Sequence, residues 1–257
     1  MKLFIVDAFT DQAFRGNPAA IVLMDEPRSA EWMQNVAMEM KHSETAFVDA
    51  TTDVDGTRGL RWFTPLVEVD LVGHATLAAT HVLGGSQSFR TRSGVLHCDV
   101  QEDNSVQLDL PIDPVVYEPH SAGIVDGLLG DVTVLGVWAD DVRTIVELQT
   151  DDVERCVPNV GEMLRRNRGR VHVTARGTGD IDFVSRYFAP AVGIPEDPVT
   201  GSAHCTLAPF WMERLGKKSF RAQQLSQRGG SLDVEINGDR VLLRGRATTV
   251  VEGELRT

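Results

Sequence analysis

The chain of 257 residues contains two copies of one motif, separated by about half its length. The first copy begins with Arg61-Trp62-Phe63-Thr64-Pro65 and the second with Arg186-Tyr187-Phe188-Ala189-Pro190. Each copy passes through a glutamate to a glycine, Gly73 or Gly201, that begins an apolar segment. The motif recurs after 125 residues counted between the first arginines and after 128 counted between the glycines, which indicates a small insertion near residues 193–195. Solenoid repeats recur about every 20 to 50 residues, so this period predicts duplication of a whole domain.

A duplication of this kind predicts two lobes that meet at a pseudo-twofold axis. Prolines at positions 111, 114 and 119 mark the link between the halves. We place an N-terminal lobe at residues 1–114 and a C-terminal lobe at residues 115–257, with the alternative that the last strand returns to the first lobe. Both have a common domain size. The two equivalent glycines then face each other across one cleft, where we expect the active site.

Most segments have the composition of β-strands, and each half has one long apolar helix around which we expect its strands to lie. Because strands and helices do not alternate regularly, the pattern predicts an α+β fold and disfavours a doubly wound nucleotide-binding fold. Residues 176–179 are only a fragment of a glycine-rich loop. Residues 88–110 predict a hairpin that turns near residue 103. Predicted helices cover residues 29–40, with Ser29 as the cap, and residues 74–83, 159–167 and 202–215.

Composition excludes several classes of function. The net charge of −12 opposes binding to DNA or RNA, and no basic stripe with interleaved aromatic residues offsets it. Cys98, Cys156 and Cys205 are odd in number and lack CxxC spacing, so neither a disulfide framework nor a zinc site is indicated. No apolar run has the length of a signal peptide or a membrane span, and we expect a cytoplasmic protein.

Two helices that begin at Gly73 and Gly201 and converge on one point would bind a carboxylate. Their first N–H groups lack partners within the helix, and both positive dipole ends would face the same ligand. The alternative is that each glycine only permits a tight turn before a buried helix. Recurrence of the glycine at equivalent places favours the binding site.

Glu44 is predicted at the junction between the first helix and the strand that begins at Thr45. A solvated surface glutamate is one interpretation. The other is a carboxyl group withdrawn from water, whose pKa rises until it can take up and release protons near neutral pH. Asp197 precedes Gly201 by four residues, and His74 directly follows Gly73. Either could be a cap or turn residue, and either could take part in catalysis.

Seven motifs resemble the phenazine-biosynthesis PhzF-like family, in the order in which that family has them, and they cover essentially the whole chain. The most specific is the run from Glu196 to His204. The motifs are Asp7-Ala8-Phe9-Thr10, Gly16-Asn17-Pro18-Ala19-Ala20, Ser43-Glu44-Thr45-Ala46-Phe47, Arg61-Trp62-Phe63-Thr64-Pro65, Glu68-Val69-Asp70-Leu71, Gly73-His74-Ala75-Thr76 and Glu196-Asp197-Pro198-Val199-Thr200-Gly201-Ser202-Ala203-His204.

The resemblance implies a diaminopimelate-epimerase-like fold of two pseudosymmetric lobes, each a barrel-like sheet wrapped around a central helix. It implies a homodimer that uses no cofactor and no metal. The best-known member isomerises trans-2,3-dihydro-3-hydroxyanthranilate by moving a hydrogen within the ring. The family's catalytic glutamate, histidine and aspartate fall on Glu44, His74 and Asp197, and the residues expected to contact the substrate are Ser43, Gly73, Thr200, Gly201 and Ser202.

Epimerases and racemases of this fold place a cysteine before each helix, whereas this chain has Val72 and Thr200 there. Without two thiols, one glutamate can still move a proton between two carbons on one face of a substrate, which favours isomerisation over racemisation. That preference depends on neither His74 nor Asp197 serving as an opposing base. Two alternatives remain open: a dehydratase or another isomerase of this fold, and a non-catalytic module that binds carboxylates. The second is disfavoured because Glu44 and Asp197 would repel an anion.

Overall fold

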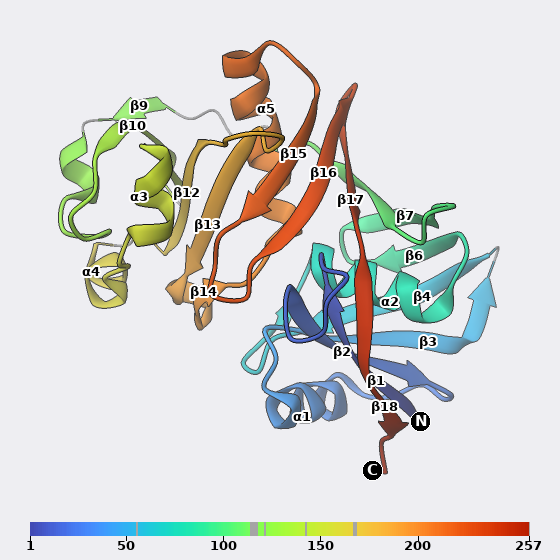
Figure 1. Cartoon of the computed structure of the whole chain (residues 1–257). Helices are drawn as coiled ribbons and strands as arrows, with labels where there is room; N and C mark the ends of the chain where they lie inside the picture. Colours follow the sequence, from blue (N-terminus) through green and yellow to red (C-terminus); the bar gives the residue numbers. More distant parts are fainter. Residues whose placement is uncertain (55, 114–117, 121, 142, 167–168, 257) are drawn as a thin grey trace.

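The computed structural model describes residues 1–54, 56–113, 118–120, 122–141, 143–166 and 169–256 (Figure 1). Its N-terminal half consists of β1 (Lys2–Ala8), β2 (Asn17–Met24), α1 (Ala30–Met40), β3 (Thr45–Val54), β4 (Thr57–Phe63), β5 (Glu68–Val69), α2 (Gly73–Leu83), β6 (Gln87–Thr91), β7 (Gly94–Val100), β8 (Val106–Pro111) and β9 (Glu118–His120). The C-terminal half consists of η1 (Ala122–Val125), β10 (Val134–Ala139), β11 (Arg143–Leu148), α3 (Thr150–Arg155), α4 (Val160–Arg165), β12 (Arg170–Arg176), β13 (Phe183–Ala189), η2 (Pro190–Val192), β14 (Ile194–Asp197), α5 (Gly201–Leu215), β15 (Ser219–Gln224), β16 (Gly230–Asn237), β17 (Arg240–Gly245) and β18 (Ala247–Glu254).

The order of strand pairing in the first half recurs in the second. In the first half, β2 and β3 are parallel, β4 pairs antiparallel with β3 and β5, and β6 joins β4 in parallel. In the second half, β11 and β12 are parallel, β13 pairs antiparallel with β12 and β14, and β15 joins β13 in parallel. The helices α2 and α5 occupy the same place in the two series, after β5 and β14. Figure 1 shows each of them beside the strands of its own half.

The two halves are joined through their strands. The strand β8 of the first half pairs antiparallel with β17 of the second half. Each half also ends in a strand that pairs with the first strand of the other half. The strand β9 pairs with β10, and β18 pairs with β1. The C-terminal strand therefore lies against the N-terminal one, and both termini are drawn close together in Figure 1. The division predicted between residues 114 and 115 lies outside the described residues.

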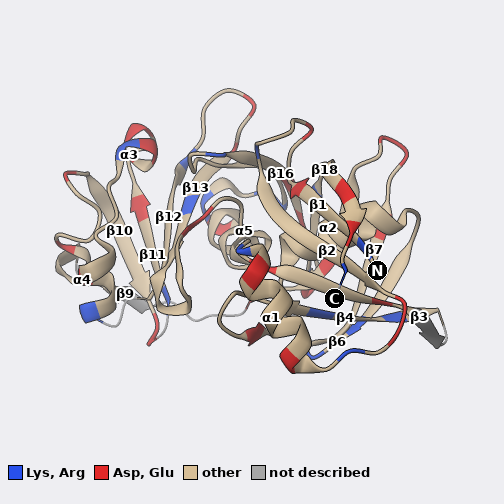
Figure 2. Cartoon of the chain, turned by 90° about the horizontal axis from the view of Figure 1, so that it is seen from below, with Lys and Arg blue, Asp and Glu red and all other residues tan. Residues whose placement is uncertain are grey.

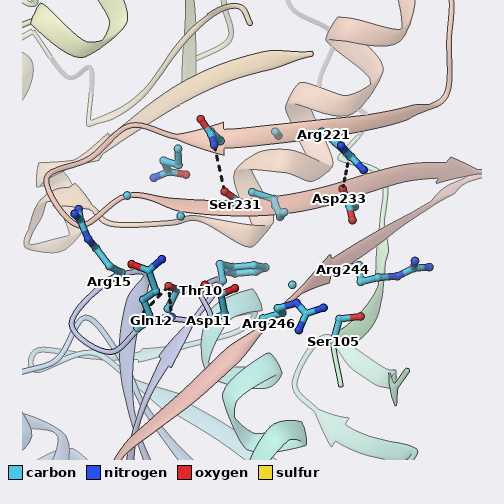
Figure 3. Close-up of a pocket in the computed structure, with 18 of the residues that line it drawn as sticks. Thr10, Asp11, Gln12, Arg15, Ser105, Arg221, Ser231, Asp233, Arg244 and Arg246 are labelled. Atoms are coloured by element: carbon cyan, nitrogen blue, oxygen red, sulfur yellow. Dashed lines mark hydrogen bonds and ion pairs between the residues drawn. The ribbon is translucent and has the colours of Figure 1, made fainter. Parts of the chain in front are cut away.

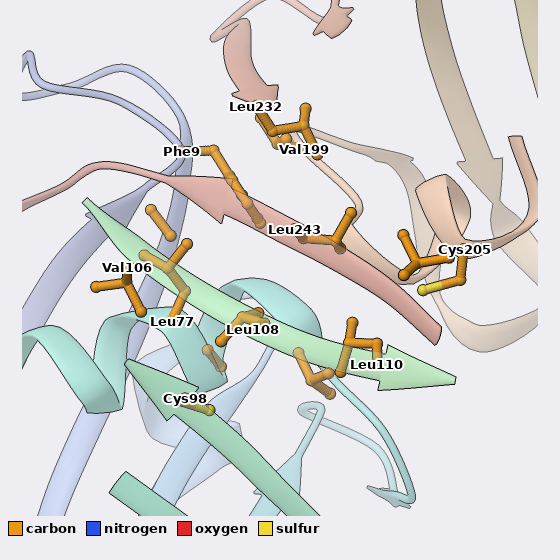
Figure 4. Packing of buried hydrophobic residues seen from close by; sticks show 14 of the residues in the cluster. Phe9, Leu77, Cys98, Val106, Leu108, Leu110, Val199, Cys205, Leu232 and Leu243 are labelled. Atoms are coloured by element: carbon orange, nitrogen blue, oxygen red, sulfur yellow. The ribbon is translucent and has the colours of Figure 1, made fainter. Parts of the chain in front are cut away.

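One large apolar cluster extends across both halves (Figure 4). Leu77 of α2, Leu108 of β8 and Leu243 of β17 are buried side by side in it, together with Phe9 and Cys205. The apolar character of α2 and α5 follows from this position, since strands surround both helices. Among the described residues, separate clusters lie under α1 and under α3 and α4.

The helix predicted from Ser29 is confirmed, and its cap is observed directly. The Ser29 hydroxyl accepts a hydrogen bond from the N–H of Trp32 at 3.1 Å, and α1 ends at Lys41, whose φ of 56° is left-handed. The second predicted cap is confirmed in part. The Asn159 side chain accepts from the N–H of Glu162, but the Glu162 carboxylate pairs with Arg165 instead of closing a capping box.

Two predictions about the strands and helices are wrong. Residues 88–110 form not one hairpin but parts of the three strands β6, β7 and β8, because the chain also turns at residues 92–93. The helix α3 was not predicted at all. It begins after Gln149 without a side-chain cap, and its six residues are too few for an apolar period to be recognised. The end of α4 lies at Arg165, two residues before the predicted end at residue 167, which is outside the described residues.

Acidic and basic positions are scattered over both halves of the chain (Figure 2). Among the described residues, no helix is long and apolar enough to cross a membrane. The described part of the chain also holds no group of three histidine, cysteine, aspartate or glutamate side chains placed to bind a metal ion. Its three cysteines are free and buried.

Candidate active site

The first residues of α2 and α5 are in contact. A Cβ atom added to Gly73 would lie 3.0 Å from the Cα of Gly201, and one added to Gly201 would lie 3.1 Å from the Cα of Gly73. Neither glycine has a positive φ, so the tight-turn interpretation is wrong. These positions need glycine because the backbones approach closely.

Both helix ends are buried and lack side-chain caps. Val72 and Thr200 precede the helices as extended residues, and neither caps its helix through a side chain. Their relative exposure is only 6% and 8%. Because the first N–H groups of a helix cannot bond within it, a buried end of this kind needs another partner. Two adjacent helix ends with positive dipoles form a suitable site for a carboxylate.

Glu44 is buried beside this contact, and the interpretation of it as a surface glutamate is wrong. It lies between the left-handed end of α1 at Lys41 and the start of β3 at Thr45, and its relative exposure is 8%. One carboxylate oxygen lies 3.4 Å from Nε2 of His74. Loss of water and then the charge of Asp197 raise the pKa of Glu44 well above its ordinary value.

Asp197 is the second buried carboxyl group, and polar side chains hold it in place. Asn17 donates to one oxygen at 2.8 Å, and the Thr200 hydroxyl donates to the other. Ser43 also hydrogen-bonds to the Asp197 side chain. Burial raises the pKa of Asp197 to about 6, while these hydrogen bonds oppose that rise. Of the two carboxyl groups, Asp197 therefore has the surroundings that better stabilise a negative charge.

His74 is neutral at physiological pH. Burial, and then the neighbouring His42, lower its pKa to about 3. The 3.4 Å contact with Glu44 is accordingly not an ion pair, and its geometry leaves Nε2 of His74 without a hydrogen bond. A neutral imidazole can orient a substrate by donating or accepting one hydrogen bond.

The predicted site residues thus come together around the two helix ends. Glu44, His74, Asp197, Ser43 and Thr200 are connected by the contacts given above. Gly73 and Gly201 touch, and Ser202 is the second residue of α5, with a partly buried side chain. The roles of these residues in binding and catalysis are hypotheses.

Three further polar residues support the site, and the sequence did not reveal their roles. Asn17 bonds both Asp197 and the carbonyl of Val199, so it fixes the loop before α5 from the other half of the chain. Gln224 accepts from the N–H of Thr200 at 2.9 Å and donates to the carbonyl of Asp197 at 2.7 Å. His42 lies close enough to His74 to lower its pKa. Asn17 belongs to one of the seven family motifs, Gly16-Asn17-Pro18-Ala19-Ala20, but Gln224 lies outside all of them.

The repeated arginine and glutamate form equivalent ion pairs that support the segment before each helix. Arg61 binds Glu68 through Nε and Nη2 at 2.8 and 2.9 Å. Arg186 binds Glu196 through the same two atoms at 2.7 and 2.9 Å. Each guanidinium also lies 5.1 Å from the ring of the phenylalanine two residues later. The repeat found in the sequence is therefore a repeat of structure.

A separate hollow of about 650 Å³ lies next to the site but does not include its carboxyl groups (Figure 3). Its lining includes Thr10, Arg15 and Ser231, and two of its residues reach the site. Phe9 packs close to Gly201, and Gln224 bonds Thr200. Glu44, His74 and Asp197 do not line this hollow. The size of the hollow is therefore a poor guide to the chemistry, and the buried carboxyl pair is the better one.

Comparison with known proteins places the chain among enzymes with this fold. Residues 6–253 match the PhzC-PhzF family, described as phenazine biosynthesis-like protein. An uncharacterised isomerase of Pseudomonas aeruginosa is 44% identical over 260 residues, which cover 98% of this chain and 97% of the relative. An uncharacterised isomerase of Halalkalibacterium halodurans is 41% identical over 264 residues, with the same coverage.

Solved structures agree with the family match. A PhzF-family phenazine biosynthesis protein of Enterococcus faecalis has a TM-score of 0.91 at 34% identity, over 100% of this chain and 99% of that one. A hydroxyproline epimerase of Agrobacterium vitis has a TM-score of 0.63 at 10% identity, over 98% of this chain and 91% of that one, and shows a similar fold alone.

The chain belongs to the PhzC-PhzF family of phenazine biosynthesis-like proteins. It is an enzyme, and two of its relatives, at 41% and 44% identity, are named isomerases. The positions before its two central helices are occupied by Val72 and Thr200, and neither has a titratable side chain.

Proposed function

We propose that the protein is a cofactor-independent isomerase that moves a proton within a small unsaturated carboxylic acid, similar to trans-2,3-dihydro-3-hydroxyanthranilate isomerase. The observation that carries the proposal is the position of Glu44. Its carboxyl group is buried next to two touching helix ends and has a raised pKa. A carboxyl of this kind can both take up and release a proton near neutral pH.

In this mechanism the substrate carboxylate binds at the first N–H groups of α2 and α5. The two positive helix ends offset the repulsion between the substrate anion and Asp197. Ser202 at the start of α5 supplies a hydroxyl donor. Binding at this fixed point places a carbon of the substrate beside Glu44.

Glu44 then removes a proton from one carbon and returns it to another carbon of the conjugated system. A single base suffices because the proton leaves one carbon and reaches the other on the same face of the bound molecule. Val72 and Thr200 offer no second base, and His74 is a weak base because burial lowers its pKa to about 3. Asp197 is engaged by Asn17, Ser43 and Thr200, which suits it to orienting the substrate and raising the pKa of Glu44.

The two halves act as pseudosymmetric lobes in this proposal, each with strands wrapped around its central helix. The repeated pairing order of β2 to β6 and β11 to β15 supports that architecture. Substrate would enter when the lobes separate at the line where α2 meets α5. Closure then excludes water from the carboxyl pair, which strengthens every electrostatic interaction with the substrate.

The test is exchange of hydrogen for deuterium. The protein is incubated in D2O with a panel of cyclic and acyclic unsaturated amino and hydroxy acids, and NMR locates the deuterium. Glu44→Gln should lower turnover at least about 100-fold, in keeping with general acid–base catalysis, while folding and affinity for carboxylic acids persist. Glu39→Gln, at an exposed position on α1, is the matched control. Near-wild-type activity of Glu44→Gln would refute the assignment.

Product analysis separates this proposal from its rivals. A product of unchanged mass with deuterium uptake identifies an isomerase, and loss of water identifies a dehydratase of the same fold. Binding of acids without any exchange across the panel would identify a non-catalytic module.

A further inference from the structure

Tyr187 is the first of the two aromatic residues in the second repeat motif, and it lies beside the carboxyl pair. It belongs to β13, where it stands directly opposite Asp197 of β14. Residues opposite each other on antiparallel strands project from the same face and have neighbouring side chains. The Tyr187 side chain is therefore adjacent to a residue of the active site.

The ring of Tyr187 is held in place by a buried histidine. His172 of β12 is its cross-strand partner on the other side, and the two ring centroids are 4.7 Å apart at an angle of 58°. His172 is only 3% exposed, and neither of its ring nitrogens has a hydrogen-bond partner among the described residues. This contact and the pairing with β14 leave the phenol little freedom to turn away from the site.

The hydroxyl of Tyr187 is a permanent donor, and it has no acceptor among the residues that the structure describes. Burial, the largest cause, raises the pKa of Tyr187 to about 12. The charges of Asp197 and Glu44 add to the rise, and those of Arg170 and Arg143 oppose it. The group therefore stays protonated at all physiological pH values. Within the part of the chain that the structure describes, no hydrogen bond engages it, although two carboxyl groups lie within electrostatic reach.

The first half of the chain lacks an equivalent arrangement. Trp62 takes the place of Tyr187 in the first motif, and it stands opposite Val69 where Tyr187 stands opposite Asp197. Its other neighbour is Ala46, where Tyr187 has His172. Trp62 is 1% exposed and belongs to the core. At this position of the repeat, the second half therefore has polar neighbours where the first half has apolar ones.

We propose that Tyr187 is a specificity-determining residue, whose hydroxyl donates a hydrogen bond to an oxygen on the substrate at the end remote from its carboxylate. The ring of Tyr187 offers a flat apolar surface for a planar substrate, and the hydroxyl selects a hydroxyl or keto group on it. The substrate class is then planar unsaturated carboxylic acids with a remote oxygen substituent. This inference rests on the proposed function, because it takes the carboxylate to bind at the ends of α2 and α5.

The experiment measures the affinities of three stable planar acids by calorimetry: benzoate, 3-hydroxybenzoate and 4-hydroxybenzoate. The wild-type protein should bind at least one hydroxybenzoate about three- to tenfold more tightly than benzoate. Tyr187→Phe should reduce that ratio to about one and leave the affinity for benzoate unchanged. Its melting temperature should not fall, since no internal hydrogen bond is lost. Thr150→Val is the matched control, because it removes a hydroxyl that bonds the carbonyl of Arg176 away from the site.

The results distinguish failure of the Tyr187 inference from failure of the proposed function. If the wild-type protein shows no preference for either hydroxybenzoate, or if Tyr187→Phe retains the preference, the role of Tyr187 is overturned while the carboxylate site stands. If none of the three acids binds, the carboxylate site fails, and both the inference and the proposed function fall. A lower melting temperature for Tyr187→Phe with an unchanged preference would assign Tyr187 a purely structural role.

Discussion

Gly73 and Gly201 are the point at which the two copies of the repeat touch, and a Cβ atom on either would lie within 3.1 Å of the Cα of the other. The contact joins the N-terminal ends of α2 and α5, which come from opposite halves of the chain. It positions both sets of free helix N–H groups next to each other. The carboxylate site proposed here therefore depends on the absence of two side chains.

Gly73→Ala should separate the helix ends. The added methyl group meets the backbone of Gly201, which cannot move aside as a flexible side chain could, so we expect a loss of about 1–3 kcal/mol in stability. Affinity for benzoate should fall as well, because the two sets of N–H groups no longer converge. Urea unfolding and calorimetry measure the two effects. Gly253→Ala is the control, since nothing lies within 4 Å of its Cβ position. An unchanged affinity would show that the helix ends do not bind the ligand together.

Asp197→Asn should change the pH dependence of the reaction. The charge of Asp197 is one of the causes that raise the pKa of Glu44, second to burial. Its removal lowers that pKa, so Glu44 loses its proton at lower pH. The acidic limb of the profile of kcat/KM against pH should therefore move to lower pH, with burial still holding the pKa above that of a free glutamate. A limb that stays in place or moves to higher pH would contradict the coupling between the two carboxyl groups.

The two repeated arginines should differ in their effect on stability. Arg186 is 9% exposed, and besides Glu196 it bonds the carbonyls of Val153, Glu154 and Cys156. Arg186→Met leaves these buried acceptors and a carboxylate without a partner, which should cost about 3 kcal/mol or more. The side chain of Arg61 is 35% exposed, so Arg61→Met should cost about 1 kcal/mol or less. Urea unfolding of both variants makes the comparison, and equal losses would contradict it.

The sequence predicted most of what the repeat and its motifs determine. The helix after each glycine and the place of Glu44 between α1 and β3 were predicted, because periodicity, caps and turn residues are local properties. The close approach of Gly73 and Gly201 was expected only from the pseudo-twofold axis. Its physical reason, contact between backbones and not a turn, required the structure.

The parts that escaped prediction depend on contacts between distant residues. Asn17 and Asp197 are 180 positions apart, and Gln224 reaches the loop before α5 from the end of β15. An asparagine or a glutamine carries no periodic signal, so its role as a donor to one particular carboxylate appears only after folding. The burial of Glu44 is of the same kind, since the sequence alone favoured a solvated surface position for it, and the structure buries it.

Replacement of His172 should change the stability of the protein in acid. Burial first, and then the charge of Arg143, lower the pKa of His172 to about 3 in the folded protein, whereas the unfolded chain binds a proton near the ordinary value of 6.5. Below that value the unfolded state holds the extra proton, so the contribution of His172 destabilises the protein increasingly as the pH falls. His172→Phe removes this term and should make the free energy of unfolding less dependent on pH by about 1.4 kcal/mol per unit between pH 6 and 4. At pH 8 the variant should be at least as stable as the wild type, since both ring nitrogens lack partners within the described structure.

Urea unfolding at a series of pH values tests this, because the other buried histidines and the carboxyl pair contribute equally to both proteins and cancel in the difference. Parallel curves for wild type and variant would mean that His172 binds its proton equally well in the folded and unfolded states.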